Sequence, residues 1–116
     1  MITIFGWLSA ALMLAVLAKF VSKRLSLKRA NAFLMKYHRT FSQALIATSL
    51  LHGVLALVTL GAWSPAVLVT GVSGFLCILT ATRSLKHGKN WRIHHRHCAA
   101  AALLLVLIHI ILHAHH

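Results

Sequence analysis

The stretch of sequence that decides the fold is residues 91–113, WRIHHRHCAAAALLLVLIHIILH. From Cys98 onwards every residue in it is apolar except His109 and His113. An α-helix rises about 1.5 Å per residue, so a stretch of this length spans about 35 Å, more than the roughly 30 Å of hydrocarbon in a bilayer. Residues 91–113 therefore predict a membrane-spanning helix that carries histidines.

Three further stretches, residues 2–21, 33–60 and 65–82, also have the length and composition of membrane spans. The chain of 116 residues is 59% hydrophobic and has 12 Lys and Arg residues but no Asp or Glu. A water-soluble domain needs surface charges of both signs, so this composition excludes the soluble classes. Basic residues follow the first stretch instead of preceding it, which indicates a retained helix and not a cleaved signal peptide. We predict an all-α, integral membrane four-helix bundle that forms a single domain over residues 1–116.

The basic residues are confined to two of the three predicted connections, and residues 61–64 between the second and third helices carry none. Short loops rich in Lys and Arg stay cytoplasmic. We therefore predict a multi-pass protein of the cytoplasmic membrane, with the first and third connections inside and both termini outside. Because these charges lie next to the spans, anionic lipid headgroups are their expected counter-charge, and nucleic acid is not an expected partner. The basic residues are Lys19, Lys23, Arg24, Lys28, Arg29, Lys36 and Arg39 around the first connection, and Arg83, Lys86, Lys89, Arg92 and Arg96 around the third.

Local sequence signals fit these boundaries. Ser64 followed by Pro65 is typical of a helix start, and Asn31 and Asn90 are candidate caps for the second and fourth helices. Tryptophan favours the membrane interface, so we expect Trp7 and Trp63 at the outer interface and Trp91 at the inner one. Small residues on the third helix would let a neighbouring helix approach closely, namely Gly71, Ser73 and Gly74.

Histidines mark the second and fourth helices. The chain has ten, and none lies in the first or third apolar stretch. His38 and His52 are 14 residues apart, as are His95 and His109. Fourteen residues fall about 40° short of four helical turns and advance about 21 Å, so each pair lies on one face of its helix at two depths. In the predicted topology both helices run from inside to outside, so His38 is level with His95 and His52 with His109. This arrangement predicts two six-coordinate haem groups, with His38 and His95 on the inner iron and His52 and His109 on the outer iron.

Other interpretations of the histidines are weaker. A buried histidine can simply form a hydrogen bond between helices, but ionisable groups inside a membrane are costly and usually functional. A zinc or copper site needs ligands that converge on one point, whereas these four are spread over two levels. His94 or His97 could replace His95 as the inner ligand, and we prefer His95 because its spacing matches that of the second helix. His113 could bind an outer propionate or substrate, and His115 and His116 could bind adventitious metal.

The faces between the paired histidines carry mostly small side chains that would leave room for porphyrin edges, although ordinary helix packing also uses such residues. They are Ser42, Leu45 and Ser49 on the second helix, and Cys98, Ala99, Ala102, Leu105 and Val106 on the fourth. Haem propionates would find no competing carboxylate in the chain. Four cations near the inner level could therefore pair with them in charge-assisted hydrogen bonds: Lys36, Arg39, Arg92 and Arg96.

Two segments, residues 36–53 (KYHRTFSQALIATSLLHG) and residues 91–113, resemble the haem helices of di-haem membrane b-type cytochromes. This group includes respiratory cytochrome b, ferric reductases and NADPH oxidases. The resemblance rests on histidines thirteen to fourteen residues apart on two helices, and it implies haem ligation by His38, His52, His95 and His109. The sequence has no flavin- or nicotinamide-binding motif and no acidic residue for a quinol site. It also has no C-x-x-C-H motif, so the two haem b groups would be non-covalent.

We expect such a chain to transfer electrons across the membrane, between a donor and an acceptor at its two faces. The partner would be a quinone, a small redox molecule or a redox protein. One alternative is an oxidoreductase that acts on quinol, superoxide or ferric iron. Another is a haem-bearing anchor subunit of a redox complex. A non-redox alternative is a metal transport or assembly protein, and a visible spectrum would separate it from the others.

Overall fold

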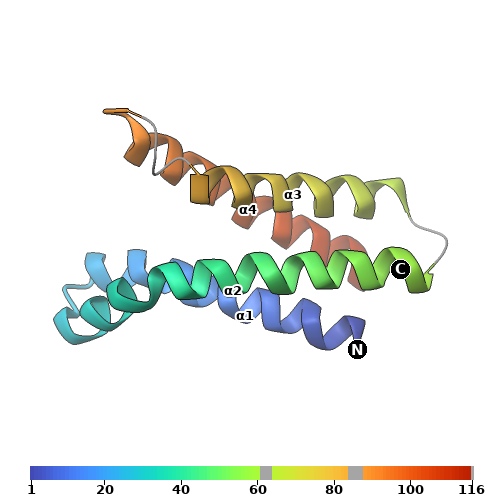
Figure 1. Ribbon diagram of the computed structural model, residues 1–116, viewed down its shortest axis with the longest axis horizontal. Helices are drawn as coiled ribbons and strands as arrows, with labels where there is room; N and C mark the ends of the chain where they lie inside the picture. Colours follow the sequence, from blue (N-terminus) through green and yellow to red (C-terminus); the bar gives the residue numbers. More distant parts are fainter. Residues whose placement is uncertain (61–63, 84–87, 116) are drawn as a thin grey trace. The chain divides into compact units, whose positions relative to one another are not determined.

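The computed structural model describes residues 1–60, 64–83 and 88–115, and it contains four helices (Figure 1). They are α1 (Ile2–Arg24), α2 (Lys28–Leu60), α3 (Pro65–Arg83) and α4 (Trp91–Ala114). The described ranges contain no strand, which confirms the all-α class. All four helices are long and apolar enough to cross a membrane, so the chain is a multi-pass membrane protein. Trp63, His87 and His116 lie outside the described residues.

The helix boundaries agree with the sequence prediction except at the start of α2. This helix begins at Lys28, five residues before the predicted residue 33. The prediction of Asn31 as its cap is therefore wrong, since the Asn31 N–H already donates a helical hydrogen bond to the Leu27 carbonyl oxygen at 2.9 Å. The predicted start followed the onset of the apolar run, whereas lysine, arginine and alanine form helix equally well outside the hydrocarbon. By contrast, α3 begins at Pro65, directly after Ser64, as predicted.

A tight turn joins α1 to α2. Ser26 has a φ of 56°, which is the left-handed conformation. The Ser26 N–H donates to the Lys23 carbonyl oxygen at 3.3 Å and the Leu27 N–H to the Ser22 carbonyl oxygen at 3.0 Å. This pair of hydrogen bonds is the Schellman motif, which usually has glycine at the left-handed position. The motif ends α1 and lets α2 start two residues later.

The chain divides into two compact units, residues 1–55 and 56–116. In the first, α1 and the following part of α2 form an antiparallel pair that we call the first hairpin (Figure 1). His52 approaches Ile2 near the start of α1, and the Ser9 hydroxyl donates a hydrogen bond to Thr48 Oγ1 at 3.1 Å. Thr48 in turn donates back to carbonyl oxygens of its own helix.

In the second unit, α3 and α4 form the second hairpin, which is also antiparallel. His109 approaches Val67 near the start of α3, and His95 approaches Ala81 near its end. Between these two contacts, Gly74 faces Leu105 and Val106, and a Cβ at Gly74 would lie 3.6 Å from the Leu105 Cβ. The predicted small-residue patch on α3 therefore does let α4 approach closely.

The two hairpins have the same register. Ile2 and Val67 accept hydrogen bonds from His52 and His109, and these positions are separated by 65 residues in α1 and α3 and by 57 in α2 and α4. The same separations relate the Ser9–Thr48 contact to the Gly74–Leu105 contact. They also relate two pairs of buried residues, Met13 with Ile78 and Leu45 with Ala102. The chain is therefore an internal structural repeat of two hairpins, although few residues are identical between them.

Candidate functional site

His52 is half-buried in the first hairpin, and its ring is held by the backbone of α1. Its Nδ1 lies 3.0 Å from the Ile2 carbonyl oxygen. A carbonyl oxygen only accepts hydrogen bonds, so Nδ1 carries the proton and donates it. In the neutral ring this leaves the lone pair on Nε2, which is the atom that can bind a metal.

His109 is held in the same way in the second hairpin. Its Nδ1 lies 3.0 Å from the Val67 carbonyl oxygen and 3.3 Å from the Thr70 hydroxyl oxygen. The Thr70 hydroxyl also lies 2.8 Å from the Ala66 carbonyl oxygen, to which it donates. Nδ1 of His109 is therefore the donor to both neighbours, and its Nε2 keeps the lone pair.

The two inner histidines are also half-buried. His95 Nδ1 lies 2.8 Å from the Ala81 carbonyl oxygen of α3, so this ring has the same tautomer as His52 and His109. Trp91, one turn earlier, packs edge-on against the His95 ring with centroids 6.4 Å apart. One turn after His38, the Ser42 hydroxyl donates to the His38 carbonyl oxygen at 2.8 Å.

A glycine lies against each outer histidine ring. A Cβ at Gly6 would lie 3.0 Å from His52 Cε1, and a Cβ at Gly71 would lie 3.1 Å from His109 Cε1. Contacts this short force the neighbour to move, so any larger residue would displace the ring edge that contains Nε2. The two glycines are equivalent in the shared register, each one turn after the residue whose carbonyl accepts the hydrogen bond.

These features fit axial ligation of a metal cofactor. Histidines that bind metals generally donate their other ring N–H to a carbonyl or carboxylate, which fixes the tautomer and makes Nε2 a stronger donor. His52, His95 and His109 all have this arrangement. Within the described residues, no three His or Cys side chains gather in a group that could hold a metal ion. The described residues therefore offer single prepared imidazoles, as haem iron requires, and not a tetrahedral zinc cluster.

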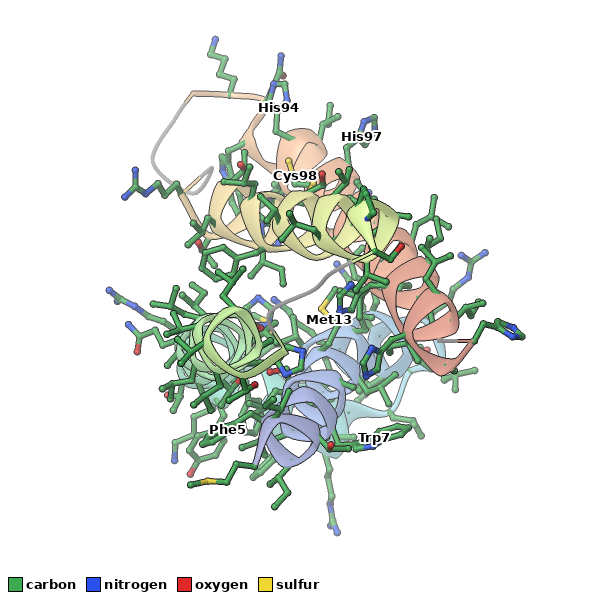
Figure 2. All side chains as sticks on the ribbon, turned by 90° about the vertical axis from the view of Figure 1, so that its right-hand side faces the viewer. Phe5, Trp7, Met13, His94, His97 and Cys98 are labelled. Carbon is green, nitrogen blue, oxygen red and sulfur yellow. The ribbon has the colours of Figure 1, made fainter. Side chains whose placement is uncertain are left out.

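His94 and His97 differ from His95 in their surroundings. Both are exposed, and Figure 2 shows their side chains projecting outward from α4, away from α3. Only His95 of the three contacts the α3 backbone in the described contacts. This difference supports His95 as the inner-level residue of α4. His113 and His115 are also exposed.

The remaining predicted site residues fall into three groups. The four cations are exposed, and two of them lie over aromatic rings: Lys36 Nζ is 5.5 Å from the Tyr37 ring centroid, and Arg92 Cζ is 5.5 Å from that of Trp91. Leu105 and Val106 pack toward Gly74 of α3. The other small-face residues are buried or half-buried: Ser42, Leu45, Ser49, Cys98, Ala99 and Ala102. Arg39 and Arg96, which directly follow His38 and His95, complete the cations.

Sequence reasoning missed the residues that hold the histidine rings. Backbone acceptors such as those of Ile2, Val67 and Ala81 leave no mark in side-chain identity. Gly6 and Thr70 could have been found from one signal. The two histidine pairs share a 57-residue separation, and extending this repeat to the preceding helices aligns Gly6 with Gly71.

Comparisons of this chain with protein-family models, with curated proteins and with solved structures find no match. The geometry of the two hairpins is therefore the basis for any functional conclusion.

Proposed function

We propose that this chain is a di-haem membrane b-type cytochrome that transfers electrons across the cytoplasmic membrane. His38 and His95 would ligate an inner haem, and His52 and His109 an outer one, the pairing that their spacing predicts. One observation carries the proposal. Three of these four histidines have Nδ1 within 2.8–3.0 Å of a carbonyl oxygen on the neighbouring helix, which reserves Nε2 as a metal ligand.

A purely structural role for the histidines would explain a hydrogen bond between helices but not its repetition. The same Nδ1–carbonyl bond and the same glycine recur at equivalent positions in two hairpins that otherwise differ in sequence. Interhelical hydrogen bonds in membranes contribute only about 0.6 kcal/mol on average, and threonine or asparagine can form them. A histidine with a fixed tautomer and a cleared ring edge fits ligation better than it fits packing.

The work of the protein in this proposal is to prepare ligands and anchor charges. Haem iron, when bound, supplies a one-electron redox couple at each of two levels. The chain holds each imidazole in one tautomer, and the histidine pairs occupy both axial positions. Exposed Lys36, Arg39, Arg92 and Arg96 are available to bind propionates. The basic first and third connections would lie in the cytoplasm. Quinone, a small redox molecule or a partner redox protein would supply and remove electrons.

Cofactor content tests the proposal directly. We expect protein purified in detergent to carry two haem b groups per chain. The reduced spectrum should have sharp low-spin α and β bands, and acidified acetone should extract the pigment. Protein that lacks haem and gives no spectral response to added haemin would overturn the proposal.

Variants at the inner level test the ligand assignment. His95→Ala should remove the inner haem and leave the outer one low-spin. His94→Ala and His97→Ala are matched controls, because they remove neighbouring but exposed imidazoles. Loss of a haem in either control, with retention in His95→Ala, would refute the assignment.

Electron transfer can be measured in liposomes. An impermeant reductant on one side should reduce an impermeant acceptor on the other in the wild type. His52→Ala should slow this transfer to the leak rate, because the outer level is lost. Equal rates in both proteins would rule out the transmembrane route and favour a haem-bearing anchor subunit.

A further inference from the structure

The two outer histidines differ in one feature of their surroundings. In the shared register, Thr70 of α3 is equivalent to Phe5 of α1, because these positions are also 65 residues apart. Thr70 Oγ1 lies 3.3 Å from His109 Nδ1. Phe5, labelled in Figure 2, has a hydrocarbon side chain that cannot accept a hydrogen bond. The N–H of His109 thus has a side-chain acceptor that the repeat does not provide for His52.

The hydroxyl of Thr70 is oriented to accept from His109. Its single proton is donated within α3, to the Ala66 carbonyl oxygen at 2.8 Å or the Val67 carbonyl oxygen at 3.1 Å. The oxygen lone pairs are left for the Nδ1–H of His109. The opposite direction, with Thr70 donating to Nδ1, would place the nitrogen lone pair against the Val67 carbonyl oxygen 3.0 Å away. The His109 N–H is therefore shared between two acceptors.

A second acceptor makes an imidazole a stronger ligand. Hydrogen bonds from the distal N–H shift electron density toward the ligating nitrogen, and hydrogen bonds around a haem ligand are one of the means by which a protein sets its potential. A stronger donor stabilises ferric over ferrous iron. The two outer ligands would therefore be chemically unequal although their backbone geometry is the same.

We propose that Thr70 is a positioning residue of the outer site, which restrains the His109 ring and lowers the reduction potential of the outer haem. This inference rests on the proposed haem function. It adds a residue that sets the potential selectively at one level, since neither Thr70 nor an equivalent hydroxyl contacts His95 in the described contacts.

Redox titration of Thr70→Val tests the inference, because valine keeps the branched shape and removes the acceptor. We expect two low-spin haems, with the midpoint potential of the outer one shifted upward, equivalent to a several-fold change in its ferric-to-ferrous equilibrium. The inner haem should titrate as in the wild type. Thr70→Ser should retain the wild-type potential because it keeps the hydroxyl. Identical outer potentials in the wild type and Thr70→Val would overturn the inference.

The reciprocal change uses the first hairpin. Phe5→Thr and Phe5→Val remove the same ring and differ only by a hydroxyl in place of a methyl group. The outer potential in Phe5→Thr should be lower than in Phe5→Val, by a shift opposite in sign to that of Thr70→Val. Equal potentials in this pair would also count against the inference.

A third measurement does not depend on the redox state of haem. In protein with ¹⁵N-labelled histidine, the His109 Nδ1–H resonance should move upfield in Thr70→Val, while that of His52 stays unchanged. An unmoved His109 resonance would remove the hydrogen bond on which the inference depends. The proposed function fails separately, if wild-type protein binds no haem at all.

Discussion

The two hairpins hold their outer histidines in the same way but are built from different contacts. In the first, a hydroxyl pair, Ser9 and Thr48, links the helices at the middle level, whereas in the second Gly74 packs against an aliphatic chain. Their connections also differ, with Ser26 in a left-handed conformation in one and Gly88 in the other. What the hairpins share is the histidine, the carbonyl that accepts its proton, and the glycine beside its ring. The shared elements are therefore those that a ligand needs, and the variable ones are those that only join helices.

The largest effects should come from the outer histidines. His52→Ala and His109→Ala should each leave one haem of the proposed two, because each removes one of the two outer axial ligands. The haem-to-protein ratio, from the pyridine haemochrome assay, should fall by half in both variants. If one variant kept both haems, the equivalence of the two hairpins would be broken.

The glycines beside the rings come next. Gly6→Ala and Gly71→Ala would each place a Cβ about 3 Å from the ring of an outer histidine. Changes in the groups that orient a metal ligand typically weaken binding 10- to 100-fold, so we expect about tenfold weaker retention of the outer haem in each. Gly53→Ala is the control, since a Cβ there meets nothing within 4 Å. Competition with apomyoglobin for haem would measure the difference, and equal retention in all three variants would contradict the prediction.

Most of the fold could be predicted from sequence, because bilayer thickness fixes helix length and apolar composition marks each span. The ends of α3 and α4 came within one residue of the predicted ones. The start of α2 could not be found in this way, because Lys28 and Arg29 are helical without being apolar. The histidine positions followed from spacing alone. Their carbonyl partners did not, because any residue at position 2, 67 or 81 would present the same oxygen.

The two connections offer a smaller contrast. A left-handed residue other than glycine costs about 1–2 kcal/mol, and Ser26, with a φ of 56°, bears this cost in the first hairpin. Ser26→Gly should therefore raise the free energy of unfolding by about 1 kcal/mol. Gly88→Ala should lower it by a similar amount, because Gly88 has a φ of 74°. Unfolding in mixed detergent and SDS micelles would measure both, and shifts of the same sign in both variants would contradict the prediction.

The smallest effect should come from the hydroxyl pair of the first hairpin. Thr48→Val removes the acceptor of the Ser9 hydrogen bond and keeps the side-chain shape. Such bonds in membranes contribute about 0.6 kcal/mol, so the free energy of unfolding should fall by about that amount. Haem content should not change. Leu105→Ile, at the equivalent position of the second hairpin, conserves volume and removes no hydrogen bond. A larger loss in Thr48→Val than in the Gly88→Ala variant would reverse the expected order.

The length of α2 bears on how deep the molecule sits in the bilayer. Its 33 residues extend about 50 Å, well beyond the roughly 30 Å of hydrocarbon. A helix with such an excess can tilt or leave one end outside, and its first turns, which carry Lys28, Arg29 and Lys36, cannot enter the hydrocarbon without a large cost. These charges act as a depth stop, because sinking the helix by one turn would bury a cation and raising it would expose apolar surface to water. The protein thereby measures the distance of His38 and His52 from the lipid headgroups along a single rigid rod, and a bilayer of different thickness would change its tilt before it changed that distance.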